Sequence, residues 1–147
     1  SDRHLFLKAQ VLFWLLGAID GHAKNFSIFL MPGGDYTLAP VYDVMSAYPL
    51  LSNRQIAFKK MKMAMAFKGK HTHYLWDSVL PRHFISTART CRSPAGDMEM
   101  IMNGLLQEMD DVIERTAGQL PPNFPGDMAR SVFDGMKQAR DRFIRLK

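Results

Sequence analysis

Apolar side chains recur at spacings of three and four residues near the start of the chain and again through its last third. This spacing places the apolar groups on one face of an α-helix. It predicts helices over residues 5–17 and 81–91, after Ser93-Pro94, and over about 127–145, with Ser93 as the cap and Pro94 as the first helical residue. The residues expected to face the core are Leu5, Phe6, Leu12, Phe13, Trp14, Leu15, Leu16, Phe84, Ala88, Cys91, Met98, Ile101, Met102, Leu105, Met109, Val112, Ile113, Val132, Met136, Ala139 and Phe143.

Two shorter stretches between these helices have the pattern of β-structure. Residues 26–31 and 36–39 are strand-like and flank the turn Pro32-Gly33-Gly34-Asp35, which predicts a β-hairpin. Alternation over residues 56–67, followed by the basic turn at 68–71, predicts another strand or ribbon. The sequence therefore predicts one domain over residues 1–147 that is mainly α with small β-ribbons, an α+β fold.

The composition is that of a globular protein with a real core, since 47% of the residues are hydrophobic and 22% are charged. No apolar run approaches the roughly 20 residues that cross a bilayer, so we expect no membrane partner. A single cysteine, Cys91, excludes an internal disulfide and suits the cytoplasm. The net charge of +5 permits partners that carry phosphate groups without identifying one.

The stretch from Asp20 to Asp43 holds the residues that are most suited to chemistry. If the hairpin turns between Gly33 and Gly34, Asn25 pairs with Tyr42 and lies beside Asp43. Asp20 comes just before this open end of the hairpin. Two carboxylates and an amide that are far apart in the sequence are therefore expected to converge.

Carboxylate and amide oxygens suit Mg²⁺, which takes its other ligands from water and nucleotide phosphates. A separate carboxylate can accept the proton of a hydroxyl group. An Asp, an Asn five residues later, a hairpin and a second Asp also form the order found in kinases. The alternative is that these Asp and Asn residues only cap helices or form turns.

Several segments resemble the HipA family of bacterial toxin serine/threonine kinases. They are Ala18-Ile19-Asp20-Gly21-His22-Ala23-Lys24-Asn25-Phe26-Ser27, Pro40-Val41-Tyr42-Asp43-Val44-Met45-Ser46, Lys62-Met63-Ala64-Met65 and Leu80-Pro81-Arg82-His83-Phe84. The resemblance covers essentially the whole chain. It implies the C-terminal lobe of a protein-kinase-like fold, which transfers the γ-phosphoryl group of ATP to a serine or threonine of a protein substrate.

The resemblance also implies roles for individual residues. Asp20 would be the catalytic base, and Asn25 and Asp43 would hold Mg²⁺. The residues that would line the ATP phosphates are His22, Ala23, Lys24, Asn25, Tyr42 and Asp43. Ala18-Ile19 and Tyr42-Asp43-Val44 differ from the His-Arg-Asp and Asp-Phe-Gly motifs of ordinary protein kinases, which puts ordinary activation-loop control in doubt.

Two kinase motifs are missing from these 147 residues, the glycine-rich nucleotide loop and the strand lysine. Both belong to the N-terminal lobe. The chain also begins at Ser1 without a methionine and enters a helical pattern almost at once. We therefore expect a fragment that lacks the N-terminal lobe and holds half of an active site.

Three arginines, Arg82, Arg89 and Arg92, share one edge of the helix expected over residues 81–91. Such an edge is either a solvated face or a contact with DNA phosphates. HipA-like toxins join a DNA-binding antitoxin, a HipB-like protein, on operator DNA. The resemblance implies that Arg89 and Arg92 contact that DNA.

Two readings from other functional classes stay open. One is a nucleic-acid-bound interaction module whose kinase residues are unused, and the other is a complete small Mg²⁺-dependent phosphohydrolase. The lysines of the second ribbon are expected to solvate its exposed edge; they are Lys59, Lys60, Lys62, Lys68 and Lys70. His71 and His73 read as a surface pair, since no third metal ligand is in view.

Overall fold

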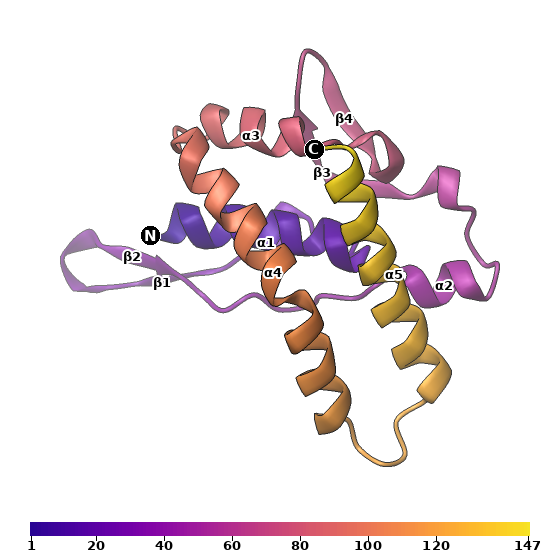
Figure 1. Ribbon diagram of the computed structural model, residues 1–147. Coiled ribbons are helices and arrows are strands. Elements are labelled where there is room, and N and C mark those ends of the chain that lie inside the picture. Colours follow the sequence, from indigo (N-terminus) through magenta and orange to yellow (C-terminus); the bar gives the residue numbers. More distant parts are fainter.

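The computed structural model describes residues 1–147 and confirms a mainly helical α+β fold (Figure 1). The helices are α1 (Asp2–Leu16), α2 (Tyr48–Ser52), α3 (Pro81–Thr90), α4 (Ala95–Gln119) and α5 (Gly126–Arg145). The strands β1 (Ile28–Leu30) and β2 (Tyr36–Leu38) form one antiparallel sheet, and β3 (Lys62–Lys68) and β4 (Thr72–Leu75) form another. None of the helices combines the length and the apolar character that a membrane crossing requires.

Helix α1 lies in the middle of the molecule, and α4 and α5 cross it as an antiparallel pair (Figure 1). Its buried stripe runs through Leu7, Val11 and Trp14, with Phe13 and Leu15 also buried. The expectation that Leu5 faces the core is wrong, because this side chain is 40% exposed. Two residues turn a helix by about 200°, so Leu5 and Leu7 lie on opposite sides of α1. For the same reason the other two outer leucines, Leu12 and Leu16, are only half-buried.

Most of the apolar residues expected on α4 and α5 are buried: Met98, Ile101, Met102, Met109, Ile113, Met136, Ala139 and Phe143. Val112 is instead exposed. Helix α4 also begins one residue later than expected, with Pro94 as its cap. Ser93 does not cap α4 through its side chain, and its backbone N–H donates to Ala88 O at the end of α3.

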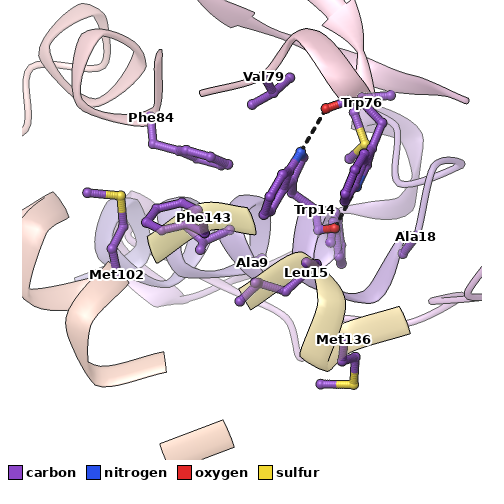
Figure 2. Packing of buried hydrophobic residues seen from close by; sticks show 14 of the residues in the cluster. Ala9, Trp14, Leu15, Ala18, Trp76, Val79, Phe84, Met102, Met136 and Phe143 are labelled. Carbon is purple, nitrogen blue, oxygen red and sulfur yellow. Dashed lines mark hydrogen bonds between the residues drawn. The ribbon is translucent and has the colours of Figure 1, made fainter. Parts of the chain in front are cut away.

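Two tryptophans join the first helix to the second ribbon (Figure 2). Trp14 Nε1 donates to Trp76 O at 3.1 Å, and Trp76 Nε1 donates to Trp14 O at 2.8 Å. Their rings stack with centroids 4.5 Å apart, and Phe84 and Phe143 pack edge-on against Trp14. Residues from α1, α3, α5 and the 3-10 turn Trp76–Ser78 that follows β4 therefore meet in one aromatic cluster.

The β1–β2 hairpin pairs Ile28 with Leu38 and Leu30 with Tyr36. This register is one residue away from the expected one and, if continued, would bring Asn25 opposite Val41 rather than Tyr42. The reason is that the turn centres on Gly33 and not on the bond between Gly33 and Gly34. Both glycines have positive φ angles, 87° and 88°. The hairpin projects from the body (Figure 1), and its apolar side chains are exposed, with Leu30 81% accessible.

The β3–β4 ribbon begins later than the pattern over residues 56–67 indicated, because Phe58–Lys60 forms a 3-10 turn. Its register is irregular between Lys62 and Phe67. Strand β3 packs against α3 through buried Phe67, whose ring centroid lies 4.6 Å from that of Phe84. The ribbon thereby carries residues 69–73 to the start of α3.

Candidate functional site

Asp20 follows directly on the end of α1, which closes at Gly17. Gly17 has a φ of 60°, and the N–H groups of Gly17 and Ala18 bond Trp14 O and Phe13 O. A Cβ at Gly17 would lie 2.8 Å from the Tyr48 ring, so the turn requires glycine for its conformation and for space. Ile19 O then accepts the Ala64 N–H from β3 at 2.9 Å, which fixes the Asp20 backbone between α1 and β3.

The Asp20 carboxylate points into solvent, with 73% of its side chain exposed. The imidazole of His22 lies beside it, with Nε2 3.9 Å from Asp20 Oδ1, while His22 Nδ1 is buried without a partner. The chain can pass this close to the Phe13 ring because residue 21 is glycine, where a Cβ would come within 2.5 Å of the ring. Asp20 is therefore held by its backbone and left open to an incoming group.

Asn25 ends a 3-10 turn, Ala23–Asn25, and is only 5% exposed. Its Nδ2 donates a hydrogen bond to Asp43 Oδ2 at 2.9 Å, across 18 residues of sequence. Asp43 has a φ of 56°, a left-handed conformation that is unusual for a residue other than glycine. Such a conformation costs energy, and structures tend to keep it at functional sites.

Tyr42 ties the same two segments together a second time. Its hydroxyl lies 2.8 Å from Ser27 Oγ and donates to Lys24 O at 3.3 Å. Ser27 is a site residue that the sequence did not indicate, because one hydroxyl in a strand-like run carries no signal. The structure thus joins Asn25 to Asp43 as expected, although the expected register is off by one. The third member of the expected group, Asp20, contacts neither of them through its side chain, and its one side-chain neighbour of opposite type is His22.

The oxygen atoms of Asn25 and Asp43 are ligands that suit a hard cation. Because Asn25 Nδ2 faces Asp43, the amide oxygen Oδ1 and one carboxylate oxygen stay free as ligands. No group of three or more His, Cys, Asp or Glu side chains gathers here or elsewhere to hold a metal. One carboxylate with one amide fits Mg²⁺, which needs few protein ligands when phosphates and water supply the others.

A hollow of about 800 Å³ opens beside Asp20. Its lining is mainly apolar and comes from the Asp20 segment, residues 45–50, β3 and β4. Lys62 lies on its wall with Nζ 5.3 Å from the centre of the Tyr74 ring. From the sequence, Lys62 was expected only to keep the exposed edge of the ribbon in contact with water. The structure shows that the ribbon also places this lysine on the same hollow as Asp20.

Arg89 is exposed on the last turn of α3, as expected, but Arg92 does not lie on that helix. Helix α3 ends at Thr90, and Arg92 has a φ of 56°. The N–H groups of Arg92 and Ser93 bond Arg89 O and Ala88 O, which closes the helix and turns the chain away. Arg3 Nη1 donates to Arg92 O at 3.0 Å. Helix α1 therefore places Arg3 beside Arg92, a neighbour that the sequence pattern did not indicate.

The remaining sequence candidates have other surroundings. The five ribbon lysines are exposed. His71 is exposed, whereas His73 stacks on His83 with ring centroids 3.8 Å apart. His83 is buried and was missed because a histidine inside a helical pattern has no distinctive signal.

The sequence matches the model of the HipA-like C-terminal domain over residues 1–113. The fold is similar to that of a chain in a solved structure from Shewanella oneidensis MR-1, described as a toxin antitoxin system HipA, HipB and its operator DNA complex. The two share 21% identity and superpose with a TM-score of 0.74 over 97% of this chain. The chain spans 31% of the length of that relative. The chain belongs to the HipA-like C-terminal domain family.

Proposed function

We propose that this chain is the C-terminal lobe of a toxin–antitoxin serine/threonine protein kinase that uses ATP and Mg²⁺. The observation that carries the proposal is the 2.9 Å contact between Asn25 and Asp43, with the exposed Asp20 carboxylate on the segment that leads to it. The family membership and the toxin–antitoxin complex formed by the structural relative support it.

Each of these residues has a distinct task in the proposed reaction. Asp20 accepts the proton of the substrate hydroxyl while the hydroxyl oxygen bonds to the γ-phosphorus and the bond to the ADP oxygen breaks. Asn25 and Asp43 would hold Mg²⁺, which would supply positive charge to offset that of the ATP phosphates. His22, Ala23, Lys24 and Tyr42 border the phosphates. The hollow beside Asp20 gives the hydroxyl-bearing segment room to approach.

The metal role can be tested on this chain alone, with Mn²⁺ as a paramagnetic substitute for Mg²⁺. We expect Mn²⁺ to broaden the side-chain amide signal of Asn25 in NMR spectra, because an ion bound to Asp43 lies next to that amide. Asp43→Ala should abolish the broadening. Excess Mg²⁺ should restore the signal in the unsubstituted chain by competition.

Asp35→Ala is the matched control, since Asp35 is an exposed carboxylate at the hairpin turn, away from Asn25. Its removal should leave the Asn25 broadening unchanged. If Asp43→Ala and Asp35→Ala behave alike, Asn25 and Asp43 do not form a metal site and the proposed division of labour fails.

We also propose that the chain contributes to binding operator DNA together with a HipB-like antitoxin. The exposed positions of Arg89 at the end of α3 and of Arg92 just beyond it favour this function. The structural relative was solved with HipB and operator DNA. A protein that binds DNA through these arginines but takes up no metal at Asp43 would be the interaction module with unused kinase residues.

A further inference from the structure

We propose that the chain has a second phosphate-binding site, away from Asp20, in the hollow between the β3–β4 turn and the first two turns of α3. The hollow measures about 280 Å³. Its lining consists of Gly69, Lys70, His71, His73, Arg82, His83 and Ser86. We call it the basic hollow.

The fully charged side chains that line the basic hollow are all positive. Lys70 and Arg82 are permanent cations at neutral pH, three histidines stand between them, and no carboxylate lines the wall. Neither Lys70 nor Arg82 forms an ion pair within the chain, although Arg140 and Arg142 do. Like charges gathered around a concave surface raise the local concentration of anions.

His83 supplies a fixed hydrogen-bond donor to the basic hollow. The ring is 4% exposed, and its Nδ1 accepts the Leu80 N–H at 3.2 Å. A neutral imidazole that accepts at Nδ1 carries its proton on Nε2. No hydrogen bond within the chain uses that Nε2 proton, so the ring N–H stays free for a group that enters the hollow.

The surrounding groups hold this donor in place. His73 stacks on His83 with the ring planes 16° apart. A Cβ at Gly69 would lie 2.9 Å from His73 Nε2 and 3.1 Å from His83 Cδ2, so the glycine lets both rings reach the turn. Burial, His73 and Arg82 lower the pKa of His83, which keeps its ring neutral and its Nε2 proton fixed.

This set of donors matches the oxygens of a phosphate group. Arg82 offers a planar pair of N–H groups, Lys70 a point charge, Ser86 a hydroxyl and His83 a ring N–H. Helix α3 spans ten residues and begins at the hollow, so its dipole adds positive potential there. The phosphate can be a free anion or part of a DNA backbone, since both present the same oxygens.

NMR of the histidine ring signals, with inorganic phosphate added at constant ionic strength, tests the proposal. We expect the His83 signals to shift saturably and the His83 pKa to rise, because a bound anion offsets the repulsion by His73 and Arg82. Arg82→Gln should weaken phosphate binding by about tenfold through loss of charged hydrogen bonds. Arg130→Gln, an equal charge change at an exposed position of α5, should leave it unchanged.

A short DNA duplex, added to the same sample, distinguishes the two sources of phosphate. If the duplex produces the His83 shifts and competes with phosphate, the ligand is a DNA backbone. If only phosphate produces them, the ligand is a free anion. The proposal is overturned if phosphate leaves His83 unshifted, or if Arg82→Gln and Arg130→Gln bind equally well. Neither result bears on the metal site at Asp43.

Discussion

The ring of Tyr48 fills the space that a side chain on Gly135 would need. A Cβ on Gly135 would overlap Cγ and Cδ2 of that ring, and a Cβ on Gly17 would press on its other end. The Tyr48 hydroxyl donates to Leu15 O at 2.9 Å, and burial raises the pKa of this hydroxyl, so it stays a donor. Tyr48 thereby spaces α1 from α5 and fixes the chain that comes from Asp43.

Gly135→Ala should destabilise the chain even though alanine is the better helix former. The helix gains up to about 1 kcal/mol in propensity, whereas overpacking against a buried ring costs about 1–3 kcal/mol. Urea unfolding of the variant and the unsubstituted chain measures the difference. The same substitution at Gly104, where a Cβ meets nothing, should be neutral or stabilising.

The clash also predicts that the two positions are coupled. Tyr48→Ala removes the ring, so Gly135→Ala should cost nothing in that background. A double-mutant cycle with additive free energies of unfolding would contradict the spacer role of Tyr48.

In a protein that carries this lobe together with a nucleotide-binding lobe, substitutions of Asp20 and of Asp43 should affect different steps, phosphoryl transfer and nucleotide binding. Asp20→Asn should nearly abolish phosphoryl transfer and leave Mg²⁺-ATP affinity almost unchanged, because in the proposed reaction that carboxylate acts on the substrate hydroxyl. Asp43→Ala should weaken nucleotide binding, because it removes a proposed ligand of Mg²⁺. Transfer assays and ATP titrations of both variants check this, and equal, mild losses from both would remove the assigned roles.

The sequence predicted most elements because their signals are local. Helical spacing located α3, α4 and α5, and the Pro-Gly-Gly-Asp turn located the hairpin. The convergence of Asn25 with Asp43 was also predictable, because the open ends of a hairpin meet in any nearby register.

The errors came from features that depend on tertiary packing or on one backbone angle. Whether Leu5 or Leu7 is buried depends on where α4 and α5 pack. Arg92 lies outside α3 because its own backbone is left-handed, and residue spacing in the sequence does not reveal such a conformation. The exposure of the apolar hairpin was not predictable either, since alternation reports strand structure and not what covers it.

DNA binding should depend on Arg89 and Arg92 through charge. In a complex with antitoxin and operator, Arg89→Ala with Arg92→Ala should lower affinity and flatten its salt dependence by about one unit of slope for each lost phosphate contact. Binding measured across a salt series checks this. Arg130→Ala is the control, and a slope unchanged by the double substitution would mean that these arginines only solvate the surface.

The stability of the chain should fall in mild acid because of His83. Its folded pKa lies below the ordinary value of 6.5, so the unfolded chain binds more protons in that range. The contribution is complete above pH 6.5 and is lost as the pH falls toward the folded pKa. The groups that face His83 are His73, Arg82, Lys70 and His71. In thermal unfolding experiments across this range, the melting temperature should depend less steeply on pH in His83→Gln than in the unsubstituted chain. In His4→Gln the dependence should be unchanged.

The 147-residue chain should fold cooperatively yet bind ATP weakly. Its helices share one hydrophobic core, so they should melt together. In the proposed function Asn25 and Asp43 bind a metal ion and, through it, a phosphate, but few other contacts remain to offset the freedom that a nucleotide loses on binding. Calorimetry with Mg²⁺-ATP should give little heat. Tight binding or phosphate transfer by this chain would favour the complete phosphohydrolase.

The paired indoles give this chain an optical reporter of its own. It has only two tryptophans, and both lie in one stack that joins α1 to the 3-10 turn after β4. All tryptophan emission therefore originates from a single contact between segments 62 residues apart. Separating α1 from the turn that follows β4 exposes both indoles to water at once, so one fluorescence spectrum reports, without any label, whether the helix that leads into Asp20 is still packed against this part of the chain.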